Sequence, residues 1–296
     1  MMETLFSKRI EGQWIHGVVH RPVKLPPGGR EHAVVFLHGA GGYRTGPHDL
    51  FVKLARELTA CGYCCIRFDF RGWGYSGRGT SAPTGSMLED IAAVLAYVRT
   101  ELGIGRVTLA GICYGAKLAL YYAKAYTDPL ESLILLSCES LRSEIKSTVA
   151  LNQAGRHSRM YLVKLFRKET WNKIVAGEIH YKKIVSIIVA PFRRVRKRKP
   201  SHPDKPFSPV RPFCGLQGGV LLIYGGKDPE TALALPQIRH LLTSHSIPFD
   251  VHLVAGANHS FYSIGWSEEI CDKMKAWLIA LPPSYKTSNQ GSKSDF

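Results

Sequence analysis

The sequence has no run of apolar residues near the ~18 that a membrane-spanning helix needs. Its first residues, MMETLFSKRIEGQW, contain no apolar stretch of the kind that marks a secretory signal. Glycine and proline number 28 and 17 among 296 residues, too few for a fibrous or disordered chain. We therefore expect a globular, cytoplasmic protein, and the residues indicate no metal and no other cofactor.

Cysteine is present in an odd number, seven, and most of the cysteines lie in apolar runs. This favours buried thiols in a reducing compartment over a disulfide framework. The cluster Cys61-Gly-Tyr-Cys64-Cys65 is spaced closely enough for a redox or metal site. Because no second Cys/His pair with ligand spacing accompanies it, we interpret it as a helix end that runs into a buried strand.

Apolar runs and helical spacing alternate along most of the chain, which fits one large α/β domain or two small ones. An antiparallel pair of strands is expected first, and a parallel sheet flanked by helices after it. The expected strands are Glu3–Arg9, Trp14–His20, Ala33–Leu37, Tyr63–Phe70, Val107–Ala110, Leu133–Ser137, Val220–Tyr224 and Asp250–Val254. The expected helices are His48–Cys61, Ser86–Leu102, Tyr114–Tyr126, Pro236–Ser244 and Trp266–Leu281.

The alternation stops between residues 139 and 217, in a basic stretch with helical spacing that ends in a Pro-rich return. We interpret residues 139–217 as a helical cap inserted into the main domain. Residues 1–138 and 218–282 then form the two parts of the core, and residues 283–296 a polar, flexible tail.

Positive charge is concentrated in this insertion. The chain has a net charge of +16, and residues 156–199 alone, with 14 Lys/Arg against Glu169 and Glu178, carry +12. Ile184–Ala190 is apolar and leads into the basic residues Arg193, Arg194, Arg196, Lys197, Arg198 and Lys199. This pattern suits peripheral contact with the inner face of an anionic membrane, or the guidance of an anionic substrate, or a solvated edge. Nucleic-acid binding is not expected, because no aromatic residues are interleaved with the basic run.

Chemistry is indicated by Gly111-Ile-Cys113-Tyr-Gly115, between an expected strand and an expected helix. This is the pattern of a nucleophile elbow, with cysteine where serine is usual. A helix N-terminus would favour the thiolate. The alternative is a tight turn that holds a small buried cysteine.

Two further candidates follow later strands in the chain order nucleophile, acid, base. Asp228 comes after Leu221–Tyr224, and His259 lies in the loop after Val251–Val254. The imidazole would deprotonate Cys113 or pair with its thiolate, and Asp228 would orient the imidazole. Glu139 is a second candidate for the acid, although a solvent-facing start to the cap explains it more simply.

An oxyanion needs backbone donors near the nucleophile. One would be the N–H of Tyr114, and the other the N–H of Ala40, in the loop His38-Gly-Ala-Gly-Gly42. We expect His38 to brace this loop. In Asp69-Phe-Arg71-Gly-Trp-Gly-Tyr-Ser, the two charged residues are expected to tie loops together.

These motifs together resemble the α/β-hydrolase superfamily, over roughly residues 10–140 and 215–282. A Cys-Asp-His set on this fold is similar to that of the dienelactone hydrolases. The segments His38–His48 and Gly256–Phe261 and the elbow cysteine resemble the bacterial exosortase A system-associated hydrolases, as does Phe166–Ile179. The resemblance implies an α/β-hydrolase fold, and a setting beside genes for exopolysaccharide export.

We therefore expect a hydrolase of esters or thioesters that works through an acyl-cysteine at Cys113, with a small acyl substrate as partner. An acyltransferase using the same three residues is an alternative, because the triad does not choose between water and an alcohol. A second alternative is a non-catalytic protein of this fold that binds a lipid or a protein partner.

Overall fold

The computed structural model describes residues 1–25, 31–76, 84–141 and 212–281. They belong to the larger of two units of the chain, Met1–Leu141 together with Ser208–Phe296. Most of the expected cap, including the basic residues from Arg193 to Lys199, lies outside the described residues, and so does the expected tail.

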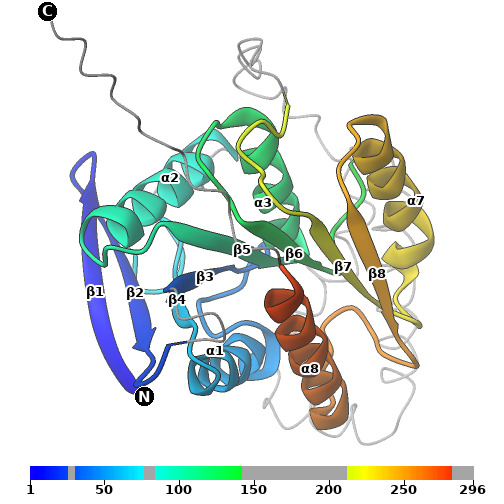
Figure 1. Ribbon diagram of the computed structural model, residues 1–296, viewed down its shortest axis with the longest axis horizontal. Coiled ribbons are helices and arrows are strands. Elements are labelled where there is room, and N and C mark those ends of the chain that lie inside the picture. The colour runs from blue at the N-terminus through cyan, green and yellow to red at the C-terminus, as the bar shows by residue number, and fades with distance from the viewer. Residues whose placement is uncertain (26–30, 77–83, 142–211, 282–296) are drawn as a thin grey trace, which may run out of the picture. The chain divides into compact units, whose positions relative to one another are not determined.

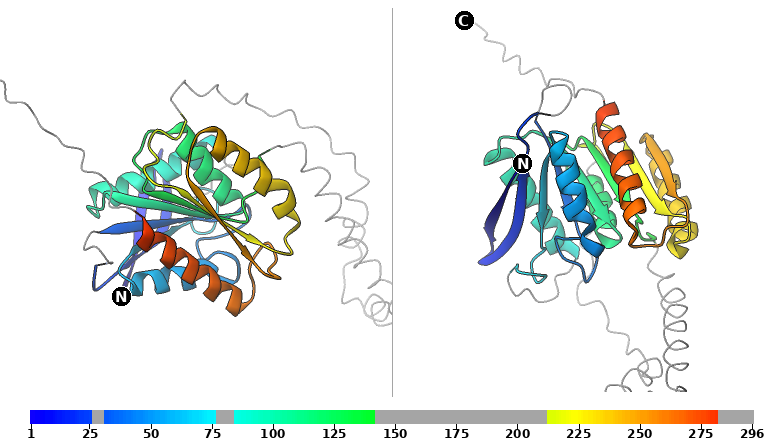
Figure 2. Two further views of the ribbon diagram at one scale, coloured as in Figure 1. Left: turned by 45° about the vertical axis from the view of Figure 1, so that its right-hand side comes forward. Right: turned by 90° about the horizontal axis from the view of Figure 1, so that it is seen from below.

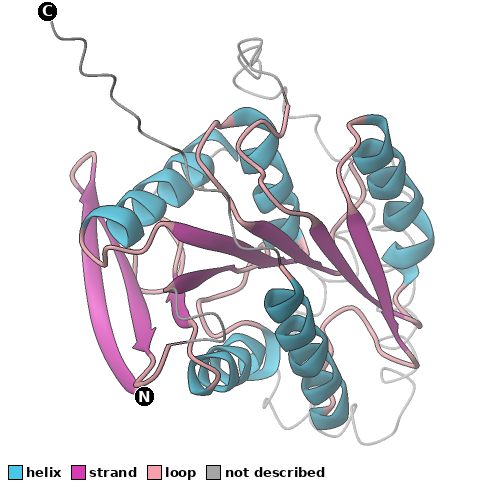
Figure 3. Ribbon diagram, in the orientation of Figure 1, coloured by secondary structure: helices cyan, strands magenta, loops and turns pink. Residues whose placement is uncertain are grey.

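One sheet of eight strands forms the centre of this unit, in the order β1-β2-β4-β3-β5-β6-β7-β8 (Figure 1). The pairs β1–β2 and β2–β4 are antiparallel, and all the other pairs are parallel. The strands are β1 (Met2–Ile10), β2 (Gln13–Arg21), β3 (His32–Leu37), β4 (Cys64–Phe68), β5 (Arg106–Ile112), β6 (Ser132–Leu136), β7 (Val220–Gly225) and β8 (Phe249–Val254). Figure 3 shows β1 and β2 as a long hairpin at one edge.

The inner strands are continuous apolar runs because helices cover both faces of the sheet. On one face lie α2 (Thr84–Thr100), α3 (Tyr114–Ala125) and α7 (Pro229–Ser244), and on the other lie α1 (Leu50–Ala60) and α8 (Ile264–Ala280) (Figures 1 and 2). A short 3₁₀ turn, η1 (Pro47–Asp49), precedes α1. Every residue of β3, β4, β6 and β7 is buried. The expected α/β architecture with a mostly parallel sheet is confirmed.

The helix α7 begins seven residues before the Pro236 at which the sequence predicted it. Proline is common in the first turn of a helix. The structure has Pro229 in that position, and Asp228 caps the helix by accepting a hydrogen bond from the Glu230 N–H at 3.0 Å. Pro236 lies inside α7. The start prediction was therefore wrong, and the correct start places the cap at a candidate site residue.

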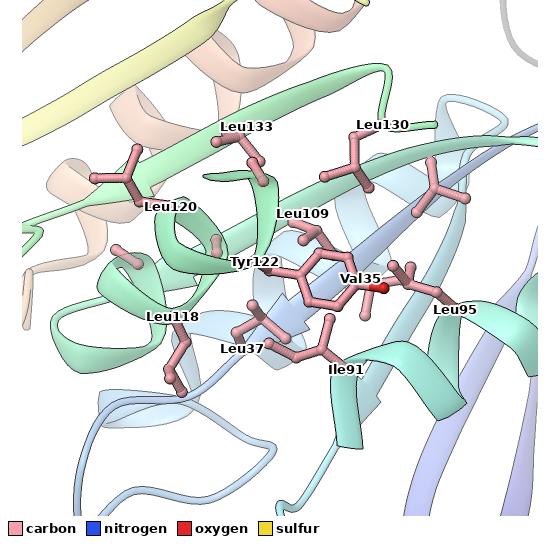
Figure 4. Close-up of a cluster of buried hydrophobic side chains, with 14 of the residues drawn as sticks. Val35, Leu37, Ile91, Leu95, Leu109, Leu118, Leu120, Tyr122, Leu130 and Leu133 are labelled. Atoms are coloured by element: carbon pink, nitrogen blue, oxygen red, sulfur yellow. The ribbon is translucent and has the colours of Figure 1, made fainter. Parts of the chain in front are cut away.

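The layer between the sheet and α3 is centred on Tyr122, which is fully buried (Figure 4). Its ring lies among Leu37, Leu109 and Ile91, and stacks on Tyr126 with 4.3 Å between ring centroids. Its hydroxyl donates to Asp128 Oδ2 at 2.8 Å, so the one polar atom of the side chain is satisfied. This packing fixes α3, and with it the turn that leads into the helix, against the sheet.

The crossing of β5 and α3 leaves no room for side chains at two glycines. A Cβ on Gly115 would lie 2.0 Å from the Leu37 carbonyl oxygen, and one on Gly111 would lie 2.5 Å from the Ala116 nitrogen. Both obstacles are backbone atoms, which cannot rotate away. Steric exclusion therefore explains why the elbow motif has glycine at both positions.

We predict that Gly115→Ala lowers the free energy of unfolding by about 3 kcal/mol, because the new methyl group forces β3 and α3 apart. Urea unfolding followed by circular dichroism measures this change. Gly105→Ala is the matched control, since a Cβ there meets nothing within 4 Å. Equal unfolding midpoints for the two variants would contradict the steric explanation.

Candidate active site

The turn between β5 and α3 holds Cys113 in a strained backbone conformation, with φ 56° and ψ −118°. A residue other than glycine adopts such angles at a cost of about 1–3 kcal/mol, and they cluster at functional sites. The Cys113 N–H donates to Leu136 O at 2.9 Å, which ties the turn to the end of β6. The side chain is half-buried at the carboxyl edge of the sheet.

The loops after β7 and β8 are joined to each other at the same edge. The Lys227 N–H donates to Ala257 O at 2.8 Å, and the Gly226 N–H donates to Val254 O at 2.9 Å. A Cβ on Gly225 would lie only 2.5 Å from the Ala257 oxygen, so the close approach requires glycine. These contacts bring together two loops whose candidate residues are 31 positions apart in the chain.

Asp228 and His259 meet where these loops join. Asp228 Oδ2 accepts a hydrogen bond from His259 Nδ1 at 2.8 Å, while Oδ1 accepts the capping bond from the Glu230 N–H. Both carboxylate oxygens are thus held, which fixes the plane of the group and the orientation of the imidazole. The Asp228 side chain is 1% exposed and that of His259 is 36% exposed, so the carboxylate is shielded from solvent and the ring is accessible to it.

The electrostatics of the pair favour a charged imidazole. Burial by itself would lower the pKa of His259, but the hydrogen bond with Asp228 and the interaction with Cys113 raise that pKa to about 10. Burial would raise the pKa of Asp228, and the hydrogen bond with His259 outweighs it, so that pKa is lowered. At neutral pH the two groups form an ion pair beside Cys113.

Glu139 contacts Cys113, the candidate nucleophile. The Cys113 thiol donates to Glu139 Oε1 with 3.3 Å between sulfur and oxygen. In the described residues, Asp228 is the carboxylate bound to His259, and Glu139 is bound to Cys113. Its position directly after β6, the neighbour of β5, was the sequence signal for this contact. That position alone does not indicate whether the carboxylate contacts Cys113 or His259.

The loop after β3 passes directly over Cys113. A Cβ on Gly39 would lie 3.3 Å from the Cys113 Cβ and 3.7 Å from its sulfur. Ala40 follows, exposed to solvent, and in the described part of the chain its N–H has no hydrogen-bond acceptor. Tyr114 is the first residue of α3. The structure thus places the loop that contains Ala40 next to Cys113, and Tyr114 directly after Cys113 at the start of α3.

His38 braces this loop, as the sequence predicts. Its Nδ1 donates to Gly39 O at 2.9 Å and its Nε2 accepts from the Phe70 N–H at 3.2 Å. Burial lowers the pKa of His38, so the ring is neutral, as these two bonds require.

Asp69 and Arg71 also tie loops together. Asp69 accepts from the Arg44 N–H at 2.6 Å, and Arg71 binds the buried Asp90 together with Glu11 and Glu89. The bond of Asp69 holds the loop after β4 beside the loop after β3, and the ion pairs of Arg71 hold it to α2 and to the turn between β1 and β2.

Within residues 1–25, 31–76, 84–141 and 212–281, no group of three His, Cys, Asp or Glu side chains is placed to hold a metal ion. In the same ranges, no helix has the length and apolar character to span a bilayer.

A family model described as alpha/beta hydrolase fold matches residues 32–174. The proline iminopeptidase of Neisseria meningitidis is 31% identical over 154 residues, which are 48% of this chain and 42% of that protein. The lysophosphatidylserine lipase ABHD12 of Xenopus tropicalis is 34% identical over 118 residues, 38% of this chain and 30% of the relative. The chain thus spans less than half the length of these relatives.

Among solved structures, the Pyrococcus furiosus esterase Pf2001 superposes with a TM-score of 0.60 at 16% identity, covering 94% of this chain and 90% of the esterase. The strand order of the sheet, the strained turn after β5 and these comparisons all indicate the same fold. The chain has the α/β-hydrolase fold, with an eight-stranded, mostly parallel sheet flanked by helices.

We predict that Asp228→Asn lowers the pKa of His259 from about 10 toward its ordinary value of ~6.5. The amide removes the negative charge, whereas the burial that disfavours the imidazolium and the interaction with Cys113 that favours it both remain. Near pH 9 a larger fraction of the imidazole should be charged in the wild type than in the variant. Proton NMR titration of His259 measures this, and the distant Asp272→Asn is the control. An unchanged titration in Asp228→Asn would contradict the assignment of the ion pair.

Proposed function

We propose that the protein is a hydrolase of ester or thioester bonds that works through an acyl-enzyme on Cys113. The observation that carries the proposal is the contact of His259 with both Asp228 and Cys113 at the carboxyl edge of the sheet. In open α/β sheets this edge is where ligands bind. The relatives and the similar structure bear the names of an iminopeptidase, a lipase and an esterase.

Each residue has a role in the proposed reaction. His259 takes the thiol proton of Cys113, the sulfur attacks the acyl carbon, and the N–H groups of Ala40 and Tyr114 receive the negative charge that develops on the carbonyl oxygen. His259 protonates the leaving group and then, as a neutral base, activates the water that releases the acyl group. Asp228 keeps the imidazole in the tautomer that presents Nε2 to the substrate. A thioester suits this site because its thiolate leaving group needs little protonation.

Transfer to an alcohol is the second candidate, since the same acyl-cysteine can be attacked by either acceptor. A protein that binds a lipid or a partner without turnover is the third. The similarity of the His38–His48 and Gly256–Phe261 motifs to the exosortase A system-associated hydrolases supports a role near exopolysaccharide export.

We predict that wild-type protein mixed with p-nitrophenyl acetate or a short acyl-thioester gains the mass of one acyl group on Cys113. Cys113→Ala should lose the adduct and at least about 10³-fold of the turnover, because the variant has no nucleophile. Intact-mass spectrometry and the release of p-nitrophenol measure the two effects.

Cys214→Ala is the matched control, because Cys214 is the exposed cysteine of the described residues and lies outside the site. It should keep both the adduct and the turnover. Turnover retained in Cys113→Ala would refute the acyl-cysteine. Neither adduct nor product in the wild type would favour the protein without catalytic activity.

We also propose peripheral membrane contact through the basic residues between Arg193 and Lys199, supported by the charge of this segment. Replacing all six basic residues of the segment by glutamine should abolish co-sedimentation with vesicles that contain phosphatidylserine. Binding of the wild type should fall with added salt, since the attraction is electrostatic. Equal binding to purely phosphatidylcholine vesicles would contradict the proposal.

A further inference from the structure

The strand β1 lies at one end of the sheet, and in the described part of the chain only β2 pairs with it (Figure 3). We call the side of β1 that faces away from β2 its outer edge. The nine residues Met2–Ile10 pair with β2 in an unbroken register and include neither proline nor glycine. Natural proteins usually shield an edge strand by making it short, bulged or interrupted by proline. β1 has none of these devices.

The backbone contacts of His16 show which groups of β1 face the outer edge. The His16 N–H donates to Ser76 Oγ at 2.9 Å, and the His16 carbonyl accepts from the Asp69 N–H at 3.0 Å. Both backbone groups of His16 therefore point away from β1. Ser7 is the residue opposite His16 in the antiparallel pair, so the N–H and the carbonyl of Ser7 point away from β2.

The same direction recurs at every second residue of an antiparallel strand. The outer edge of β1 is therefore formed by the backbone groups of Glu3, Leu5, Ser7 and Arg9, and no other described strand pairs with them. Their side chains share one face of β1, and all four residues are exposed to solvent. Leu5 is 82% exposed. Such a row of donors and acceptors is a template for pairing with a further strand.

We propose that this outer edge binds a second copy of the chain, with the two β1 strands antiparallel and centred on Phe6. In this register Glu3 lies opposite Arg9 of the other copy, and Leu5 lies opposite Ser7. Each of these pairs exchanges two backbone hydrogen bonds. Because Phe6 is the middle residue of Met2–Ile10, the register uses every outward group of β1. The proposal concerns assembly and does not rest on the proposed acyl-enzyme chemistry.

The charges of β1 favour this register, and they favour a partner identical to the chain itself. The pair of Glu3 and Arg9 occurs twice, once on each side of the two-fold axis. Opposite charges at directly opposite positions stabilise a pair of strands, and like charges destabilise it. Among the described residues Arg9 forms no ion pair, and its guanidinium lies 5.9 Å from the centre of the Trp14 ring. A shift of the register by two residues in either direction would break both charge pairs.

The other face of β1 is already packed within the chain. Phe6 stacks on Tyr97 of α2, with 4.7 Å between ring centroids. Lys8 Nζ binds Glu101 Oε1 at 2.8 Å, so the lysine of the strand is directed to the end of α2 and not to the outer edge. These contacts hold β1 straight against the sheet. In the proposed dimer, the exposed Leu5 side chains of the two copies lie diagonally across the axis, where they shield each other from water.

The test is an exchange of charge between two variants. Arg9→Glu puts a carboxylate opposite Glu3 of the other copy, and Glu3→Arg puts a guanidinium opposite Arg9, so each variant alone has only repulsive pairs. An equal mixture of the two variants can form a dimer in which both pairs are attractive. Sedimentation velocity should show dimers for the wild type and for the mixture. Each variant alone should dissociate, with a dissociation constant raised at least about tenfold.

Two control variants should stay dimeric. Lys124→Glu reverses an exposed charge on α3, away from β1. Arg56→Gln removes the bond between Arg56 Nε and Glu3 Oε1, 2.8 Å long, which Glu3→Arg also removes. Circular dichroism checks the fold of each variant.

Amide hydrogen exchange of the wild type keeps the test decisive if a variant folds poorly. The outward amides of Leu5, Ser7 and Arg9 should be protected at high protein concentration and lose this protection on dilution. The amides of Phe6 and Lys8 point toward β2 and should be protected at every concentration. This alternation is specific to pairing along the outer edge of β1.

Three results overturn the proposal: a wild type that is monomeric at about 100 μM, where even weak interfaces associate, a dimer that Arg9→Glu leaves intact, or a mixture of variants that stays monomeric. Protection that depends on concentration but does not alternate along β1 also overturns it. A monomer whose outward amides become protected only when an extended peptide is added would show that the edge takes a strand of another protein and not a second copy.

Discussion

In the site, α3 crosses closely over the ends of β3 and β5, and the positions of Cys113 and of the loop after β3 depend on this crossing. Gly115 lies so near the Leu37 oxygen that a single methyl group has no room. Cys113, in the turn that leads into this crossing, has the strained φ and ψ. The crossing also brings Gly39 over the sulfur, because Gly39 follows Leu37 by only two residues. The nucleophile candidate and the oxyanion loop are thus placed by one packing constraint.

A second constraint joins the helix α7 to the candidate base. Asp228 uses one carboxylate oxygen as the N-cap of the helix and the other as the partner of His259. A cap residue between a buried strand and a helix that packs on the sheet has little freedom, so the orientation of the imidazole is fixed by the core. The backbone hydrogen bonds between the loops after β7 and β8 also restrict the position of His259. The accessible ring of His259 is therefore held by a buried and immobile carboxylate, which is the arrangement that preorganised proton transfer needs.

Much of this could be read from the sequence because parallel strands are apolar runs with their carboxyl ends at one edge. Cys113, Asp228 and His259 each follow such a run, and their convergence required only that the runs be adjacent in the sheet. The boundary of α7 could not be read as well, because Pro236 and Pro229 carry the same start signal and only packing distinguishes them. The direction of the Glu139 side chain could not be predicted from the sequence either. Its place after β6 was visible, but the direction of its side chain is set by bonds from Lys117, Gln237 and Tyr224 that lie far apart in the chain.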